Sequence, residues 1–221
     1  MNKIHVFLLP GLGANTKIFE RLNWPEFVEL HPLEWRIPES MDESLNSYAK
    51  RIGKSIEEYH NVVLLGVSFG GVMVQEIAKI YPVKQVILIS SIKSKHELPP
   101  SLKFFKETKL YKLFPAKQLN LIEKFALKFS KGKTRERISF YDYYLDKRNP
   151  LYLNWSIEQI MNWDQDKPEN NITHLQGSKD EIFPVKYLND YQEIKGGDHA
   201  MVLIKAKKIS TILDKVLHKM R

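Results

Sequence analysis

The amino-acid sequence predicts an α/β fold, with a mostly parallel sheet and helices on both of its faces. Short runs that are almost wholly apolar, such as residues 86–89, fit strands buried on both faces, as parallel strands are. Amphipathic segments with the period of a helix alternate with these runs. A glycine-rich corner at residues 66–71 joins one strand directly to one helix. There is no internal repeat or low-complexity linker, which favours one domain over residues 1–221.

Residues 3–35 predict two strands with a short helix between them. Residues 3–9 predict a strand, and a loop with two glycines follows it. A short helix is expected at 16–22, and residues 27–35 are apolar and extended enough for a second strand. Because the opening apolar stretch is short, interrupted by His5 and ended by Pro10, we interpret it as a core strand and not as a signal peptide.

A longer helix is expected from residue 40 to about residue 59. Ser40 and Glu43 match a capping box, in which the two side chains bond free N–H groups of the first turn. The spacing of the apolar residues that follow places five of them on one face, as in a helix that covers a sheet. These five are Leu45, Tyr48, Ala49, Ile52 and Ile56.

The centre of the chain predicts two further strands with a helix between them. Residues 61–65 are apolar and end at the glycine-rich corner, and an amphipathic helix follows at 72–80. A proline stops this helix, and residues 86–89 give the next strand. Strands separated by helices in this way pair in parallel.

From residue 93 to about residue 166 aromatic and basic residues mix at helical spacing, with no strand pattern. This segment predicts a helical cap inserted between two strands. Its aromatic residues are Phe104, Phe105, Tyr111, Phe114, Phe125, Phe129, Phe140, Tyr141, Tyr143, Tyr144, Tyr152 and Trp155. The sheet is expected to resume with strands at 172–176 and 191–195, and an amphipathic helix at 202–218 closes the chain.

The composition narrows the classes of function. The formal net charge is +8, but the lysines are scattered and no nucleic-acid motif appears, which favours a solvated basic surface over a nucleic-acid partner. No stretch approaches the ~20 apolar residues of a transmembrane helix. The absence of cysteine excludes disulfides and thiolate chemistry and fits a cytoplasmic location.

The segment Gly66-Val67-Ser68-Phe69-Gly70 has the pattern of a nucleophile elbow. Its serine stands at a tight strand-to-helix turn, where glycines two positions before and after leave room around it. Such a turn lifts the hydroxyl out of the sheet and aims the free N–H groups of the helix N-terminus at the reacting centre. The alternative is a glycine-rich turn with an idle serine, and the flanking strand and helix favour Ser68 as a nucleophile.

A serine nucleophile needs a base within hydrogen-bond reach. Among seven histidines, His199 is the best candidate, because its loop joins the last strand to the last helix. Active sites of open α/β sheets lie at that edge. His5 and His174 fall within predicted strands and are assigned structural roles.

The base needs an acid to orient it, and Asp180 is the best candidate. It lies in a loop that follows a predicted strand and ends at a proline. Glu181 and Asp198 are its competitors, although Glu181 would have to point the other way and Asp198 directly adjoins His199. The order Ser, Asp, His along the chain is the one found in α/β-hydrolases.

Two backbone N–H groups are expected to form an oxyanion hole, which stabilises the negative charge of the reaction. Phe69 follows the nucleophile and should supply one donor. Leu12, in the loop after the first strand, should supply the other. A competing interpretation takes Gly11 and Gly13 as a dinucleotide-binding loop, but the third glycine of that motif is missing.

Together these motifs resemble the α/β-hydrolase family. The motifs are Pro10-Gly11-Leu12-Gly13, Gly66-Val67-Ser68-Phe69-Gly70-Gly71, Gly177-Ser178-Lys179-Asp180 and Gly197-Asp198-His199. The resemblance covers nearly the whole chain outside the cap. It implies the α/β-hydrolase fold, with Ser68 as nucleophile, Asp180 as acid, His199 as base and Leu12 and Phe69 as oxyanion donors. It also implies a cap domain at the aromatic-rich segment.

The sequence departs from the family pattern in three respects. Pro10 stands where the family commonly has a histidine, and the chain begins directly with the strand that feeds this loop. The leading strands of the family are therefore expected to be missing. Only 19 residues separate Asp180 from His199. A shortened version of the fold is implied.

The cap bears on the substrate, because its aromatic residues can line an apolar cleft for an acyl chain or an aromatic group. Trp155 and Trp163 are the candidate substrate-binding residues, together with Phe69. The alternative for most of the aromatic residues is that they pack the cap on the core.

The predicted function is a serine hydrolase that cleaves a carboxylic ester or thioester through an acyl-enzyme. It requires no metal and no organic cofactor, and its partner is a small acyl substrate. Acyl transfer, or peptide or C–C bond hydrolysis, on the same three residues is an alternative, because a fold does not fix the acceptor. Two non-enzymatic alternatives are a hydrolase-like ligand-binding protein and a basic protein of lipid surfaces.

Overall fold

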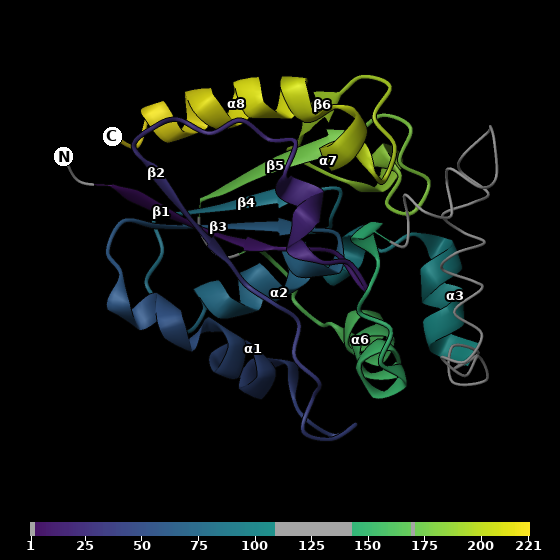
Figure 1. Ribbon diagram of the computed structural model, residues 1–221. Coiled ribbons are helices and arrows are strands. Elements are labelled where there is room, and N and C mark those ends of the chain that lie inside the picture. The colour runs from purple at the N-terminus through teal and green to yellow at the C-terminus, as the bar shows by residue number, and fades with distance from the viewer. Residues whose placement is uncertain (1–2, 109–142, 169–170) are drawn as a thin grey trace.

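The computed structural model describes residues 3–108, 143–168 and 171–221. Its centre is a six-stranded, wholly parallel sheet with strand order β2-β1-β3-β4-β5-β6 (Figure 1). The strands are β1 (Ile4–Leu9), β2 (Val28–Pro32), β3 (Val62–Val67), β4 (Gln85–Ile89), β5 (Ile172–Gly177) and β6 (Gln192–Ile194).

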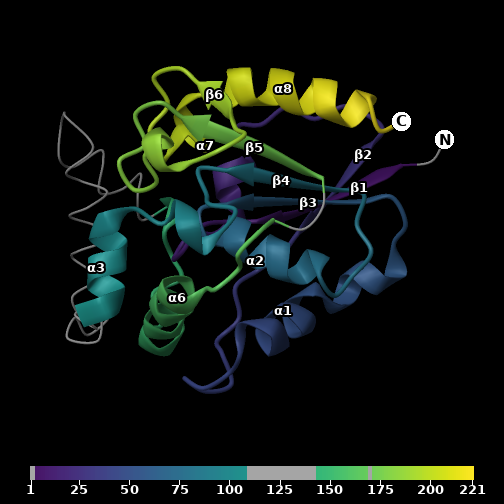
Figure 2. The same cartoon turned by 180° about the vertical axis from the view of Figure 1, so that it is seen from behind.

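Helices cover both faces of the sheet, as Figures 1 and 2 show from opposite sides. One face carries α1 and α2, and the other carries α7 and α8. The α-helices are α1 (Leu45–Gly53), α2 (Phe69–Ala78), α3 (Pro100–Thr108), α6 (Pro150–Asn162), α7 (Met201–Ile204) and α8 (Ala206–His218). Short 3-10 turns occupy Thr16–Phe19, Lys54–Glu58, Lys95–Glu97 and Val185–Tyr187. The α/β architecture predicted from the sequence is confirmed.

Strand β1 shows why the central strands are continuously apolar. Its Phe7 and Leu9 side chains pack into the core under α1 and α2. Val6 and Leu8 point the opposite way, into the core under α8. Successive side chains of a strand face opposite sides, so a strand covered on both sides has no polar alternation.

The predicted start of the first long helix is wrong. Residue 40 does not begin it: α1 begins at Leu45, and the N-cap is Ser44, whose hydroxyl accepts the N–H of Ser47. The Glu43 carboxylate instead accepts the N–H of Glu39 and pairs with Arg51 at 2.9 Å. The glutamate that the local pattern assigned to a helix cap therefore forms an ion pair with an arginine eight residues further along the chain.

Two other helices differ from the expectation. The helix expected at 16–22 is a single 3-10 turn at Thr16–Phe19. The helix expected at 202–218 is interrupted at Lys205, whose φ of −118° and ψ of 22° are not helical. The interruption separates the short α7, which directly follows the His199 loop, from α8.

The regular secondary structure described between β4 and β5 is all helical, with loops between the helices. This segment holds α3 and α6, which lie beyond the ends of the strands towards which the arrows point (Figures 1 and 2). Six of the aromatic residues noted in this segment lie outside the described residues: Tyr111, Phe114, Phe125, Phe129, Phe140 and Tyr141. The limits of the cap, 93 and 166, stay a prediction. Within the described part of the chain, no helix combines the length and apolar character needed to cross a membrane.

Candidate active site

Ser68 lies at the corner between β3 and α2, in a backbone conformation that non-glycine residues seldom adopt. Its φ is 54° and its ψ is −122°. The corner is fixed by hydrogen bonds, because the N–H of Ser68 donates to the Ile89 carbonyl at 3.0 Å and the Ser91 hydroxyl donates to the Ser68 carbonyl at 2.7 Å. Strain held in place in this way is typical of functional sites.

The glycines around Ser68 are required by close backbone approach. A Cβ atom on Gly66 would lie 2.3 Å from the carbonyl oxygen of Gly70, and one on Gly70 would lie 2.3 Å from that of Pro10. Both contacts are with backbone atoms, which cannot rotate away. The pattern G-x-S-x-G is thus required here by close packing within the turn, at Gly66, and against the loop after β1, at Gly70.

His199 connects Ser68 to Asp180. Its Nε2 lies 2.9 Å from the Ser68 Oγ, and its Nδ1 lies 2.9 Å from an oxygen of Asp180. The ring also packs edge-on against Phe183, with 5.6 Å between ring centroids. The structure therefore brings together three residues that lie 131 and 19 positions apart in the sequence. This arrangement allows the imidazole to take a proton from the hydroxyl while a carboxylate holds its other nitrogen.

Asp180 is buried and ionised. Its Oδ1 accepts the N–H groups of Ile182 and Phe183, both at 2.9 Å. Burial raises the pKa of this carboxyl, but the nearby His199 and the two backbone donors outweigh it, so the pKa of Asp180 lies below its ordinary value. The carboxylate can therefore stabilise a positive charge on His199.

The two competing acids do not face His199. Glu181 is exposed at the surface. The carboxylate of Asp198 accepts the N–H of Ala200 at 2.9 Å, which fixes the turn that carries His199. Asp180 is thus the acid that the folded chain presents to the histidine.

Gln176 is a member of the site that the sequence did not reveal. Its amide nitrogen donates to Asp180 and to the Phe183 carbonyl, both at 2.8 Å, and its amide oxygen faces the His174 Nε2 at 3.2 Å. Burial lowers the pKa of His174 to about 4, so this histidine is neutral and donates its Nε2–H to the glutamine. A buried chain of polar groups thus runs from His174 through Gln176 to Asp180 and His199.

The role of Gln176 is not evident from the sequence, because the residue lies within a predicted strand and a strand pattern does not identify side-chain partners. One feature of the sequence nevertheless indicates this role. His174 and Gln176 are two polar residues on the same face of one strand, and a glutamine four residues before a candidate acid can reach it. Buried polar side chains require partners, so such a pair points to a polar network.

The loop after β1 packs against the elbow. A Cβ atom on Gly11 would lie 3.4 Å from the Ser68 Cβ, so the loop packs closely against Ser68. The Trp35 indole N–H donates to the Gly11 carbonyl at 3.0 Å and anchors the loop. The N–H groups of Leu12 and Phe69 make no hydrogen bond with any described residue, which leaves them available to an oxyanion.

Trp155 and Trp163, the predicted substrate-binding residues, lie in the core. Trp155 is fully buried, and its N–H donates to the Glu43 carbonyl at 2.7 Å. Trp163 is 4% exposed, and its N–H donates to a Glu76 carboxylate oxygen at 2.8 Å. Both indoles pack α6 and its end against the core.

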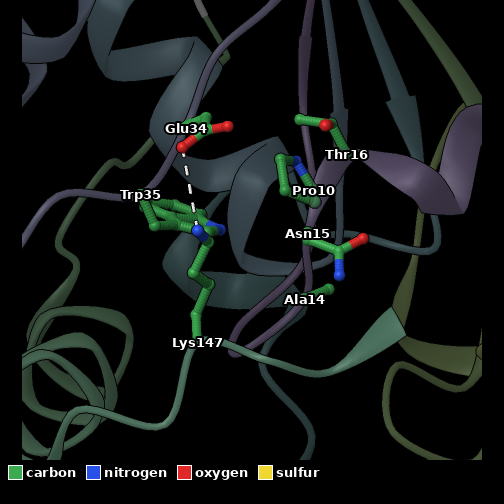
Figure 3. Close-up of a pocket in the computed structure, with 7 residues that line it drawn as sticks. All are labelled: Pro10, Ala14, Asn15, Thr16, Glu34, Trp35 and Lys147. Carbon is green, nitrogen blue, oxygen red and sulfur yellow. Dashed lines mark ion pairs between the residues drawn. The ribbon is translucent and has the colours of Figure 1, made fainter. Parts of the chain in front are cut away.

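A small pocket lies beside the loop after β1 (Figure 3). Its lining includes Pro10 and Trp35, and its rim carries an ion pair between Lys147 and Glu34 at 3.7 Å. Trp35 also stacks on Phe69, with 5.2 Å between ring centroids. Trp35 thus joins the pocket to the residue that follows the nucleophile, a connection absent from the sequence prediction.

Comparisons with known proteins agree with this architecture. No protein-family model matches the sequence, and no curated protein matches it. An esterase from Exiguobacterium antarcticum has a TM-score of 0.71 at 18% identity, covering 96% of this chain and 91% of that one. A thermophilic esterase from Thermogutta terrifontis has a TM-score of 0.71 at 13% identity, covering 99% and 91%.

A bromoperoxidase from Bacillus anthracis is similar to the same extent, with a TM-score of 0.71 at 16% identity, covering 96% of this chain and 90% of that one. These solved structures are α/β-hydrolases. Their likeness, together with the six parallel strands and the elbow, establishes that the chain has the α/β-hydrolase fold.

Proposed function

We propose that this protein is a serine hydrolase that cleaves carboxylic esters or thioesters. The observation that carries the proposal is the continuous contact from Ser68 through His199 to Asp180, with both hydrogen-bond distances at 2.9 Å. A serine without a catalytic role does not require a buried, ionised carboxylate connected to its hydroxyl through two hydrogen bonds. The named activities of the similar structures, esterase among them, support the same class of chemistry.

In the proposed reaction the Ser68 oxygen attacks the acyl carbon while His199 Nε2 takes the hydroxyl proton. The carbonyl oxygen becomes an oxyanion, which accepts hydrogen bonds from the N–H groups of Leu12 and Phe69. As the tetrahedral intermediate collapses, His199 returns the proton to the leaving alcohol or thiol and the acyl group remains on Ser68. His199 then activates water for the second half of the reaction.

Asp180 acts through His199 throughout. It accepts the Nδ1–H, which holds the ring with Nε2 towards Ser68, and it stabilises the imidazolium formed when the proton is taken. Because Asp180 is buried, its charge is little screened by solvent. The free N–H of Phe69 at the start of α2 adds the positive end of the helix dipole beside the oxyanion.

The proposal is tested with p-nitrophenyl esters and acyl thioesters of increasing chain length. The wild-type protein should hydrolyse part of this series and should be labelled at Ser68 by a fluorophosphonate, as mass spectrometry of the peptides would show. The Ser68→Ala variant should lose the label and at least about 10³-fold in kcat/KM. Ser55→Ala, a change at an exposed serine, is the matched control and should behave as wild type.

Full activity in Ser68→Ala would overturn the proposal. Absence of both turnover and fluorophosphonate labelling in the folded wild type would point instead to a ligand-binding protein. Addition of alcohols and amines as competing acceptors tells hydrolysis from acyl transfer, because a transferase forms the new ester or amide in preference to the free acid.

A further inference from the structure

A second cluster of reactive side chains lies away from Ser68, where β1 pairs with the edge strand β2. His5, Glu29 and His31 offer ligand atoms that all lie within 4.8 Å of one another. His5 Nδ1 is 3.0 Å from His31 Nε2, and His31 Nε2 is 3.8 Å from a Glu29 oxygen. Register explains the convergence, because His5 is paired with Glu29 and Phe7 with His31, so all four side chains share one face of the sheet.

These separations are those of a metal-ligand set. A tetrahedral zinc ion with ligands at 2.0–2.1 Å keeps its ligand atoms about 3.3 Å apart. The two measured separations lie on either side of that value, so small side-chain rotations bring all three atoms to bonding distance of one ion. No backbone movement is needed, since the strands that carry them are already paired in the sheet.

The surroundings hold the ligands in place. The His31 ring stacks on Phe7, with 4.6 Å between centroids, and lies 4.4 Å from the Tyr59 ring. Lys3 holds the outer oxygen of Glu29 at 2.9 Å and leaves the inner oxygen turned towards His31.

We propose that His5, Glu29 and His31 form a binding site for zinc or a similar divalent transition-metal ion. Two imidazoles and one carboxylate select zinc, copper or nickel over magnesium and calcium, which prefer oxygen ligands. Glu29 is 40% exposed, so water completes the coordination. His5 binds through Nδ1 and His31 through Nε2, and each ring carries its remaining hydrogen on the other nitrogen.

The site is distinct from the proposed active site. His31 pairs with Phe7, and Phe7 pairs with Leu64, so the nearest part of the cluster lies four residues of chain before Ser68, about 13 Å along the strand direction. The metal joins the edge strand β2 to β1 and acts as a cross-link between them. Its effect is therefore on the stability of this edge of the sheet and not on turnover.

The test is calorimetric titration of the full chain with zinc chloride, after removal of any histidine tag and in a buffer that does not bind metals. We expect one zinc per chain with a dissociation constant of about 10 μM or lower. His31→Gln and His5→Gln should each weaken binding at least tenfold, and Glu29→Gln by about tenfold. Zinc should raise the Tm of the wild type and leave that of His31→Gln almost unchanged.

Two matched controls locate the ion. His96→Gln changes an exposed histidine elsewhere and should bind zinc as wild type. His199→Gln removes the imidazole of the proposed active site and should also retain binding. Melting of each metal-free variant shows that it is folded, and the three ligand variants support one another if any one fails to fold. No saturable uptake by the wild type, or binding as tight as that of the wild type in both His5→Gln and His31→Gln, would overturn the proposal and leave a hydrogen-bonded histidine pair.

Discussion

The two halves of the candidate active site are built by different means. On the side of Ser68, the backbone sets the geometry, since Gly66 and Gly70 allow main-chain atoms to touch and the serine is held at a φ of 54°. On the side of Asp180, side chains set the geometry through a buried chain of hydrogen bonds that starts at His174. The difference teaches that Ser68 is positioned by steric exclusion, whereas Asp180 is positioned by hydrogen bonds between buried polar groups.

The largest expected effect is on the acid side. Asp180 Oδ1 accepts two backbone N–H groups, and Oδ2 faces His199 and Gln176. In Asp180→Asn the amide nitrogen that replaces Oδ2 cannot accept the His199 Nδ1–H, so the histidine turns to the wrong tautomer. We expect kcat/KM on the best ester to fall about 10⁴-fold, the size of effect known for this change in a serine protease. Asp198→Asn is the matched control, because its oxygen can still accept the Ala200 N–H. A loss below about tenfold in Asp180→Asn would remove Asp180 from the proposed mechanism.

The next effect concerns the elbow. Gly70→Ala places a methyl group 2.3 Å from the Pro10 carbonyl oxygen and 2.4 Å from that of Leu9, and neither can move without shifting β1. We expect the free energy of unfolding to drop by about 3 kcal/mol or more, measured by urea denaturation. Gly196→Ala is the comparison, because its φ of 69° is strained but its surroundings are open. That change should cost only about 1 kcal/mol.

An equal loss of stability in Gly70→Ala and Gly196→Ala would contradict steric exclusion as the principle of the elbow. It would show that the elbow can move enough to accommodate a methyl group at position 70.

A third prediction uses the pH dependence of stability. Burial lowers the pKa of His174 from 6.5 to about 4, so below pH 6.5 the unfolded chain binds a proton there that the folded chain does not. The free energy of unfolding should therefore fall as the pH is lowered from about 6.5 to 4, by up to about 3 kcal/mol from this residue. His174→Gln should flatten that slope in urea titrations at a series of pH values. His96→Gln, at an exposed histidine, should keep the wild-type slope.

The smallest expected effect is on positioning. Gln176→Met removes a donor from Asp180 and leaves the Phe183 carbonyl unpaired, so kcat/KM should fall about tenfold. The pKa of Asp180 should rise without this donor, so activity should be lost at a higher pH on acidification. Gln165→Met is the control, because this buried amide donates to Gln75 and the Lys93 carbonyl and not to the active site. It should lose stability while its pH profile stays unchanged.

If Gln176→Met loses stability but keeps the pH profile of the wild type, Gln176 supports only the fold. The position of Asp180 would then depend only on its backbone donors, which belong to the loop after β5.

The sequence prediction is accurate where the local backbone sets the geometry, and it is less accurate where contacts between distant side chains set it. Residues that act through contiguous chain geometry, such as the elbow around Ser68, were located because strand, turn and helix are adjacent in sequence. The capping box predicted at Ser40 does not form, because Glu43 pairs with Arg51, eight residues further along the chain. Trp155 and Trp163 were expected at the substrate because aromatic composition does not tell which side of a helix is buried.

The sequence by itself determined the α/β class, the alternation of strands and helices and the elbow, because apolar periodicity and glycine spacing are local properties of the chain. It also named Asp180 and His199, since loops after parallel strands reach one edge of the sheet. Only the tertiary structure decided that Gln176 and His174 support the acid, that Trp35 anchors the loop after β1 and that His5 meets Glu29 and His31. These relations depend on strand register and on hydrogen bonds between distant side chains, which arise only when the sheet is assembled.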